Sequence, residues 1–363
     1  MLYIRGHKII KGYVGNAPIS HVGFGKSGLI KIKSENVGSD HPNNLIAKYT
    51  TNTSGVLPTF NSGYQYTVNE TESNGVYTVE ISSDSDFTSC SFNGKTKLLT
   101  VEYLKVTDKA TTMENLFNGC KSLTKVNTSN FDTSNVTDMN YMLCNCTALT
   151  SLDVSNFNTS KVTRMQSTFL GCTKLIELDV SNWDVSKVKT IYKMFQNCSK
   201  LTNLDVSKWK TDSLANVIYA FADCSALTEL DVSNWNVSGT SNFHHIFNNC
   251  KALTYLDLSK WDVKNVTATY DMFNGCSSLV SLDLSGWNMN KVTDYSNMFA
   301  VTSMLTRITM TNSDYNSVNK VIALLESKTS GYGLLDITGV DDISLVDEAT
   351  LNSKNWVLSN IGN

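Results

Sequence analysis

The chain has 363 residues, of which 41% are hydrophobic and 17% charged, so it can bury a large core and is not intrinsically disordered. Its formal net charge of −3 gives no electrostatic reason to expect nucleic acid or an anionic membrane surface as a partner. The sequence contains no apolar run long enough to span a bilayer and no signal-type start, so we expect neither membrane insertion nor secretion.

The first part of the chain carries signals for β structure. An aromatic residue near a glycine turn recurs about every ten positions in residues 1–31: Tyr3, Tyr13 and Phe24. This rhythm predicts a small β-meander and is similar to short β modules at the start of some bacteriophage virion proteins. Residues 35–62 show no periodicity and predict loops, whereas Asn74-Gly75 lies between two apolar stretches and indicates a hairpin. We expect a β-rich anchoring and capping domain over residues 1–95.

A repeat of 26 residues then runs from residue 113 to residue 310 without an insertion. Seven of the nine cysteines form one column of this repeat: Cys120, Cys146, Cys172, Cys198, Cys224, Cys250 and Cys276. An aromatic column accompanies it: Phe131, Phe157, Trp183, Trp209, Trp235, Trp261 and Trp287. Repetition at a fixed period of this length is typical of solenoids, in which neighbouring units stack to bury a continuous core.

One unit, read from Cys172, is CTKLIELDVSNWDVSKVKTIYKMFQN. Leu178 and Val180 alternate with polar residues, which predicts a half-buried strand. The later apolar residues are spaced as in a short helix: Val188, Ile191, Met194 and Phe195. Ser186 lies where such a helix would have its N-cap. A strand and a short helix within 20–29 residues indicate the leucine-rich-repeat class.

We therefore expect an α/β solenoid over residues 96–312, with a parallel β-sheet, short helices and about eight units. The recurring LDVSNWxxSxVTxMxxMFxxC resembles the BspA-like leucine-rich repeat of bacterial surface antigens, which is also common in mycoplasma surface lipoproteins. The resemblance covers about residues 113–312. It implies a protein without catalytic activity, because members are mostly adhesins or surface-exposed proteins. The chain departs from that family by lacking a signal or lipoprotein peptide.

The repeat fails after residue 310. Residues 318–326 predict an amphipathic helix, and residues 334–337 a strand. A second helix is expected to begin near Ser344 and to end before Trp356. Residues 313–363 should thus form a C-terminal α/β cap that covers the last strand of the solenoid.

The repeated columns have both structural and chemical interpretations. The cysteines lack companion histidines at zinc spacing, so we expect buried free thiols rather than a metal site, and no cofactor. The tryptophans could stack on sugars, but their unbroken repetition favours an internal aromatic ladder. The pair His244-His245 has no Ser/His/Asp or Cys/His spacing around it, so no catalytic residue is predicted.

An aspartate column should point outward from the strands: Asp153, Asp179, Asp205, Asp231, Asp257 and Asp283. Like charges about 4.8 Å apart repel by about 1 kcal/mol in water. We therefore expect each carboxylate to accept hydrogen bonds from an adjacent serine or backbone group. Cation binding along this column is the alternative.

A second outward column differs every repeat or two, while its neighbours are fixed: Lys125, Ser151, Glu177, Asn203, Glu229, Tyr255 and Ser281. Variation on a constant framework is how a repeat surface encodes recognition. This variable sheet column is the predicted partner-binding site.

Three functions stay open. The first is a non-enzymatic bacteriophage virion protein (tail fibre, head fibre or decoration protein), assembled in the host cytoplasm and displayed on the virion surface. The N-terminal domain would contact other virion proteins, and the solenoid a host cell-surface protein or glycan. The second is a bacterial cell-surface adhesin, and the third an accessory of a glycan-degrading enzyme or peptidase. The missing signal peptide favours the first; whether the protein is a homo-oligomer is left open.

Overall fold

The computed structural model describes residues 44–60, 66–83 and 87–359, together with the backbone of six short strands before residue 44. Those strands are β1 (Leu2–Ile4), β2 (His7–Ile9), β3 (Tyr13–Val14), β4 (Ala17–Pro18), β5 (His21–Phe24) and β6 (Ile30–Lys33). They pair antiparallel as β1 with β2, β3 with β4 and β5 with β6. The glycine turns predicted between these strands lie outside the described residues.

The N-terminal sheet continues with longer strands: β7 (Leu45–Thr51), β8 (Thr59–Phe60), β9 (Thr67–Ser73), β10 (Val76–Ser82), β11 (Cys90–Ser91) and β12 (Leu98–Leu104). The hairpin predicted at Asn74-Gly75 is confirmed, since both residues have positive φ and join β9 to antiparallel β10. The prediction of loops over residues 35–62 is wrong for β7. This strand lies between β10 and β12, and its buried residues alternate with partly exposed ones from Ala47 to Thr51, but the polar Thr51 at a buried position obscures this period in the sequence.

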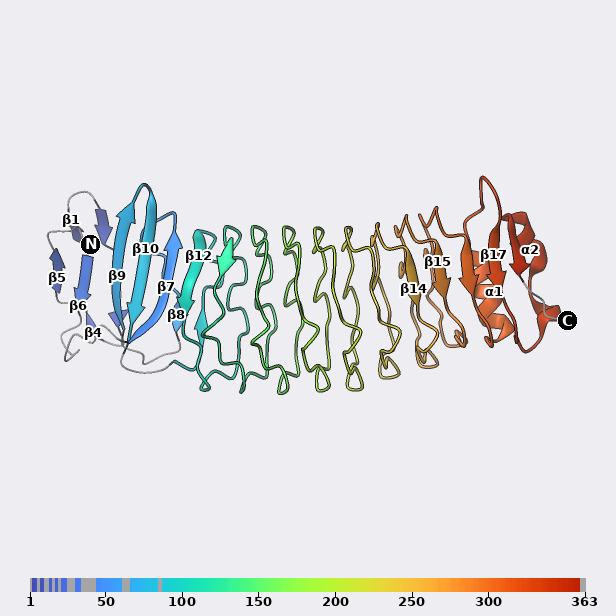
Figure 1. Ribbon diagram of the computed structural model, residues 1–363, viewed down its shortest axis with the longest axis horizontal. Helices are drawn as coiled ribbons and strands as arrows, with labels where there is room; N and C mark the ends of the chain where they lie inside the picture. Colours follow the sequence, from blue (N-terminus) through green and yellow to red (C-terminus); the bar gives the residue numbers. More distant parts are fainter. Residues whose placement is uncertain are drawn as a thin grey trace.

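This sheet runs without a break into the solenoid. Strand β12 pairs antiparallel with β7 on one side and parallel with β13 (Lys125–Val126) on the other. The sheet therefore changes from antiparallel to parallel at β12. In Figure 1 the N-terminal strands form one end of an elongated molecule, and the coils stack against them in chain order. The first coil thus has no exposed strand edge on its N-terminal side.

The repeat forms a β-solenoid of about ten turns, in which successive coils lie on one another (Figure 1). Strands β14 (Tyr255–Asp257), β15 (Ser281–Asp283) and β16 (Arg307–Thr309) pair parallel, with residues of one column opposite each other. Isolated parallel bridges join earlier coils in the same way, as between Ser151 and Glu177. The predicted parallel sheet and 26-residue repeat are confirmed.

The predicted α/β solenoid of the leucine-rich-repeat class, with a short helix in each of about eight units, is wrong in its helices: the coils form a β-solenoid of about ten turns with little helix. Between residues 191 and 198 the backbone makes a run of turns, in which Met194 N–H donates to Ile191 O (2.9 Å) instead of to a residue four positions earlier. Every second N–H leaves the coil altogether, so that Lys193 N–H donates to Ile218 O of the next coil at 3.0 Å. The apolar spacing of a helix is thus produced by turns that direct Met194 and Phe195 inward.

Two residues of each coil adopt positive φ within this run of turns, which no α-helix permits. The second of these positions holds Gly, Asn or Asp in seven of eight coils: Gly119, Asn145, Gly171, Asn197, Asp223, Asn249, Gly275 and Val301. These are the residue types that tolerate the left-handed conformation. This column is a sequence signal against a helix.

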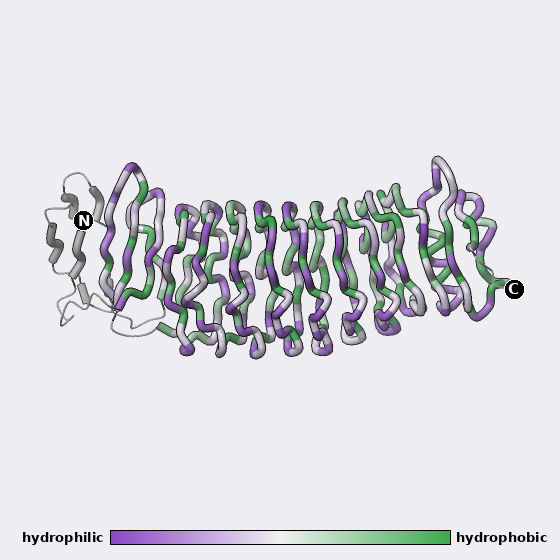
Figure 2. Tube along the Cα trace, viewed as in Figure 1, coloured by the Kyte–Doolittle hydropathy of each residue, from purple (hydrophilic) through white to green (hydrophobic). Residues whose placement is uncertain are grey.

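Aromatic side chains fill the interior as predicted. The rings of Trp209 and Trp235 stack with centroids 5.8 Å apart and an interplanar angle of 7°. The indole N–H groups of the last four residues of the aromatic column, Trp209 to Trp287, each donate to a carbonyl of the preceding coil. Trp235 Nε1, for example, donates to Val206 O at 3.2 Å. Figure 2 shows hydrophobic and hydrophilic residues alternating along the coils, as expected when every coil contributes to one shared core.

The cysteine column is also internal, and the predicted packing as buried free thiols is confirmed. The thiol of Cys146 donates to Phe117 O of the preceding coil at 3.1 Å, and the same carbonyl accepts the Cys120 N–H at 3.0 Å. The contact recurs along the column. Burial raises the pKa of Cys172 to about 12, so this thiol stays protonated at neutral pH.

The C-terminal cap contains α1 (Tyr315–Leu324), β17 (Gly333–Asp336), the 3-10 helix η1 (Ile343–Leu345), α2 (Glu348–Ser353) and β18 (Trp356–Ser359). Strands β17 and β18 extend the parallel sheet beyond β16. Helix α1 begins earlier than predicted because Asp314 caps it and accepts the Ser317 N–H at 3.0 Å. The second predicted helix is divided into η1 and α2. Among the described residues, neither α-helix has the length and apolar character needed to cross a membrane.

Lysine ammonium groups complete the hydrogen bonding at this end. Lys320 Nζ donates to Met289 O and Val292 O at 2.7 and 2.9 Å, and Lys328 Nζ donates to Ser303 O at 3.3 Å. These carbonyls belong to the last coils of the repeat. Burial lowers the pKa of both lysines, because the charged ammonium group loses hydration in this position.

Candidate functional site

The structure brings the seven residues of the variable sheet column into one line on the outer face of the strands. Six of them are exposed, and Ser281 is half-buried. Ser151, Glu177 and Asn203 are bridged to one another, and Tyr255 lies opposite Ser281. The ring of Tyr255 is 51% exposed although it stands on a regular strand. The predicted column therefore exists as a continuous line on the surface. Its largest side chain, that of Tyr255, lies near the C-terminal end.

The aspartate column lies beside it, and its predicted hydrogen bonding is confirmed. Asp179 accepts from both the N–H and the Oγ–H of Ser181, at 3.0 and 2.7 Å. The same pair of bonds recurs at four further coils, on Asp153, Asp205, Asp231 and Asp257. The serine hydroxyl and N–H hold the pKa of Asp153, Asp179 and Asp205 below the usual value. These three aspartates are thus charged at neutral pH.

The sheet face therefore presents a line of carboxylates beside its variable positions. Glu177 and Glu229 add to the charge of the aspartates, and Lys125 stands near the N-terminal end. No three His, Cys, Asp or Glu side chains within the described ranges converge to hold a metal ion. The face is suited to contact a surface that carries positive charge.

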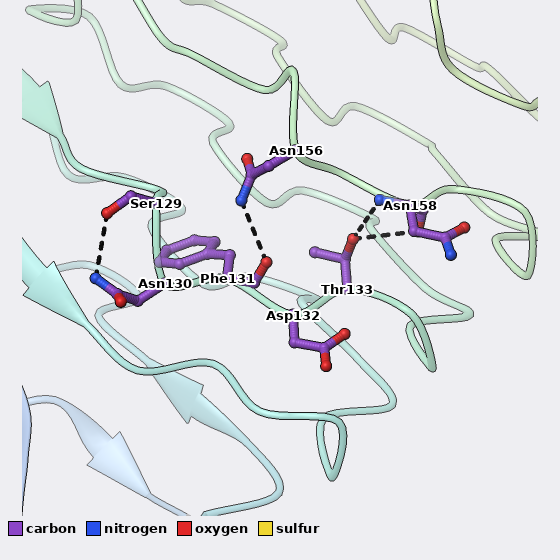
Figure 3. A pocket seen from close by; sticks show the side chains of 7 residues that line it. All are labelled: Ser129, Asn130, Phe131, Asp132, Thr133, Asn156 and Asn158. Carbon is purple, nitrogen blue, oxygen red and sulfur yellow. Dashed lines mark hydrogen bonds between the residues drawn. The ribbon is translucent and has the colours of Figure 1, made fainter.

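A shallow polar hollow of about 400 Å³ lies where the aromatic ladder begins. It is lined by Ser129, Asn130, Phe131, Asp132, Thr133, Asn156 and Asn158. Figure 3 shows that the side chain of Asn156 points toward Phe131 and that of Thr133 toward Asn158. Asn156 Nδ2 donates to Phe131 O at 3.3 Å, and Thr133 Oγ1 lies within hydrogen-bond distance of both Asn158 N and Asn158 O. Most polar groups here already form hydrogen bonds within a coil or between neighbouring coils, so the hollow does not guide the assignment of a function.

Sequence reasoning missed a second variable surface, which lies at the start of the run of turns. Two adjacent positions change in nearly every coil. The first carries Glu114, Asn140, Gln166, Tyr192, Ile218, His244, Tyr270 and Ser296. The second, whose residues all have positive φ, carries Asn115, Tyr141, Ser167, Lys193, Tyr219, His245, Asp271 and Asn297. Comparing the residues at one position of successive repeats selected the sheet column. The same comparison would have found these two positions as well.

Aromatic and histidine side chains of this turn face stack across coils. The imidazole of His245 lies on the ring of Tyr219 with centroids 4.3 Å apart and an interplanar angle of 12°. Its Nε2 is hydrogen-bonded to the hydroxyl of Tyr270 and lies 3.9 Å from Asp271 Oδ2. Lys193 belongs to the coil before that of Tyr219, and its ammonium group lies 5.0 Å from the centroid of the Tyr219 ring. The sequence pair His244-His245 is thus part of a cluster built by four coils.

Burial lowers the pKa of both histidines, since the charged imidazolium loses more hydration than the neutral ring. The buried atoms His244 Nε2 and His245 Nδ1 have no hydrogen-bond partner. Neither histidine is hydrogen-bonded to a serine or cysteine that could act as a nucleophile. The absence of a catalytic site stays a prediction.

The profile of one family, described as "Mycoplasma protein of unknown function, DUF285", matches residues 111–229 and again residues 217–331. The chain belongs to the DUF285 family. The sequence resemblance to a mycoplasma-type repeat is confirmed at this level. No curated protein matches the chain significantly.

The two DUF285 matches cover the coils and helix α1, and they leave out the N-terminal sheet. Both variable surfaces lie within them. The description of DUF285 assigns no activity, so the chemistry of these surfaces is the guide to function.

Proposed function

We propose that this DUF285 protein is a non-enzymatic attachment scaffold whose sheet face binds a macromolecular partner on a cell surface. The observation that carries the proposal is the variable sheet column. Its residues differ from coil to coil and are exposed, while the leucine and aspartate columns beside them are held by core packing and serine hydrogen bonds. A rigid frame with changeable contacts is what a recognition surface requires.

The partner class follows from the charge of this face. Carboxylates lie beside the variable positions, and those of Asp179 and Asp205, whose pKa is lowered, are ionised at neutral pH. A protein that presents lysine or arginine side chains along an extended surface complements them. Tyr255 supplies the aromatic contact that protein interfaces favour. We therefore favour a cell-surface protein over an uncharged glycan as the partner of the sheet face.

Two settings fit an attachment scaffold. On a bacteriophage, the N-terminal sheet would anchor the protein to other virion proteins and leave the coils outside. On a bacterium, the same coils would act as a cell-surface adhesin, and the DUF285 match favours this second setting because its description names mycoplasmas. Immunogold electron microscopy of producing cells and of the particles they release tells the two apart. Labelling confined to the cytoplasm would contradict both.

The attachment itself is tested with a variant drawn from the chain's own coils. Ser151 and Ser281 occupy the variable sheet column, so Glu177→Ser, Glu229→Ser and Tyr255→Ser together should leave the fold intact. We expect fluorescently labelled protein to bind intact bacterial or animal epithelial cells, and the triple variant to bind at least tenfold less. The control is Asp184→Asn with Asp262→Asn, which copies Asn158 and Asn236 at another position of the coil. Equal binding by the triple variant and the unaltered protein would refute the proposal.

A further inference from the structure

Five cationic residues gather on two adjacent coils: Lys161, Arg164, Lys187, Lys189 and Lys193. They belong to residues 161–172 and 187–198, segments that contain no aspartate or glutamate. Arg164 and Glu177 of the acidic sheet face are half a coil apart. The nearly neutral net charge of the chain therefore hides two faces of opposite sign. We name these five residues the basic strip.

Three members of the basic strip form no ion pair with a described residue, although Lys187 is near enough to Asp184 to help lower the pKa of that carboxyl group. Arg164 forms an ion pair with Asp138 of the preceding coil. Lys187, Lys189 and Lys193 make no ion pair with any of the described residues, and the first two are exposed. Lys193 instead lies 5.1 and 5.0 Å from the ring centroids of Tyr192 and Tyr219. Its charge is held in place by rings, which leave its donors open to an anion.

Bulky residues in and beside the strip adopt a left-handed backbone conformation that such residues normally avoid. Lys193, Tyr219 and His245 have φ of 56°, 58° and 54°. The first and last coils place Asn115 and Asn297 at the same position, and asparagine tolerates this conformation better. Strain that persists in the middle of a repeat marks positions where the side chain is needed.

We propose that the basic strip, with the neighbouring Tyr192 and Tyr219, binds a linear anionic polysaccharide that carries sulfate or carboxylate groups. Lys161 and Lys187 occupy the same position of two coils about 4.8 Å apart, and Lys187, Lys189 and Lys193 follow one another along one coil, so an extended polymer can contact several cations at once. Ammonium groups bind sulfate and carboxylate as point charges, and tyrosine hydroxyls can donate to sugar oxygens. This site is separate from the sheet face and does not depend on its function.

A single-stranded nucleic acid fits this surface less well. Its sequence-independent binding relies on bases that stack on free aromatic faces. The ring of Tyr219 already has His245 of the following coil stacked on it and Lys193 of the preceding coil near it. The hydroxyl of Tyr219 is hydrogen-bonded to Tyr270, whereas the ammonium groups of the strip stay available, and these suit an anionic polysaccharide.

Neighbouring coils supply substitutions for the test. Lys187→Ser, Lys189→Ala and Lys193→Asn copy Ser213, Ala215 and Asn297 at the same positions of other coils. The matched control removes three lysines of the same part of the solenoid: Lys174→Ala, Lys200→Ala and Lys208→Asn. These copy Ala148, Ala226 and Asn234. The two triple variants change net charge equally and differ only in the face that they alter.

Binding of a heparin oligosaccharide, of neutral dextran and of a single-stranded thymidine oligonucleotide is measured by biolayer interferometry at 50 and 300 mM salt. We expect heparin to bind the unaltered protein, more weakly at high salt. The strip variant should lose at least tenfold in affinity, and the control less than twofold. Circular dichroism confirms that both variants fold.

Three outcomes overturn the proposal: no heparin binding, an equal loss in the control, or oligonucleotide binding as tight as heparin binding and abolished in the same variant. The sheet-face variant Glu177→Ser/Glu229→Ser/Tyr255→Ser should bind heparin at least as well as the unaltered protein. Its failure on cells with intact heparin binding would separate the two surfaces.

Discussion

The strand face and the turn face of each coil carry variable residues under different constraints. On the strand, the backbone conformation suits almost any side chain, so variation from Lys125 to Ser281 meets little resistance. In the turns, two positions of each coil require positive φ, and one of them keeps to Gly, Asn or Asp in all but the last coil. The other holds Tyr141, Lys193, Tyr219 and His245. Variation that persists despite a conformational cost is the stronger indication of a function.

The comparison assumes that both faces rest on one interior, and removal of an interior ring tests this. Trp235→Ala deletes a buried indole that stacks on Trp209 and donates to Val206 O. We expect a loss of about 3–5 kcal/mol in the free energy of unfolding. Denaturant titration followed by circular dichroism measures it. Tyr255→Ala on the strand face is the control and should change stability by less than about 0.5 kcal/mol. Similar losses for the two variants would contradict a shared core.

The difference between the faces is sharpened by exchanging residues at the second positive-φ position. Gly275→Val places a β-branched residue at φ +79°, and its Cβ would lie 2.3 Å from Asn249 Oδ1. We expect a loss of about 2 kcal/mol. Val301→Asn relieves the same kind of strain at an exposed site and should gain up to about 1 kcal/mol. Thermal denaturation measures both. A strand-face variant, Ser281→Val, should change little, and a loss as large as that of Gly275→Val would remove the distinction.

The smallest expected effect is the loss of stability between pH 7 and 5, which is assigned to the histidines of the turn face because the sheet-face aspartates with lowered pKa titrate at more acidic pH. Burial lowers the folded-state pKa of His244 and His245 below their unfolded value of about 6.5. The stabilisation is complete above that value, and it is lost as the pH falls toward the folded pKa, because the unfolded chain binds protons first. His244→Tyr with His245→Asn, which copy Tyr270 and Asn297, should flatten the dependence between pH 7 and 5. An unchanged slope of the melting temperature would assign it to other groups.

Much of the fold follows from the sequence because stacked coils repeat the same contacts. The period, the parallel sheet, the buried thiols and the tryptophan ladder all result from identical side chains placed over one another. The run of turns in each coil could not be predicted from apolar spacing, which indicated a helix instead. Met194 and Phe195 point inward from turns as they would from a helix, and only the Gly, Asn and Asp column records the difference.

The candidate site was predictable in part. The variable sheet column is exposed as expected, because alternation along a strand fixes which side chains point outward. The cluster of Tyr219, His245 and Tyr270 depends on where the turns direct side chains of different coils, and the assumed helix would have placed them elsewhere. Strand β7 was missed for another reason, since a polar residue, Thr51, takes one of its buried positions and its pairing partners β10 and β12 are distant in the sequence.

The lysines of the C-terminal cap have a consequence for how this rod can change in size. Lys320 and Lys328 occupy the carbonyls of the last coils, and β17 and β18 cover the final strand. A second molecule cannot reach those carbonyls, and the strand edge at this end belongs to β18 instead of to a coil of the repeat. Duplication of whole coils inside the gene would lengthen the rod by about 4.8 Å per coil and leave both ends as they are.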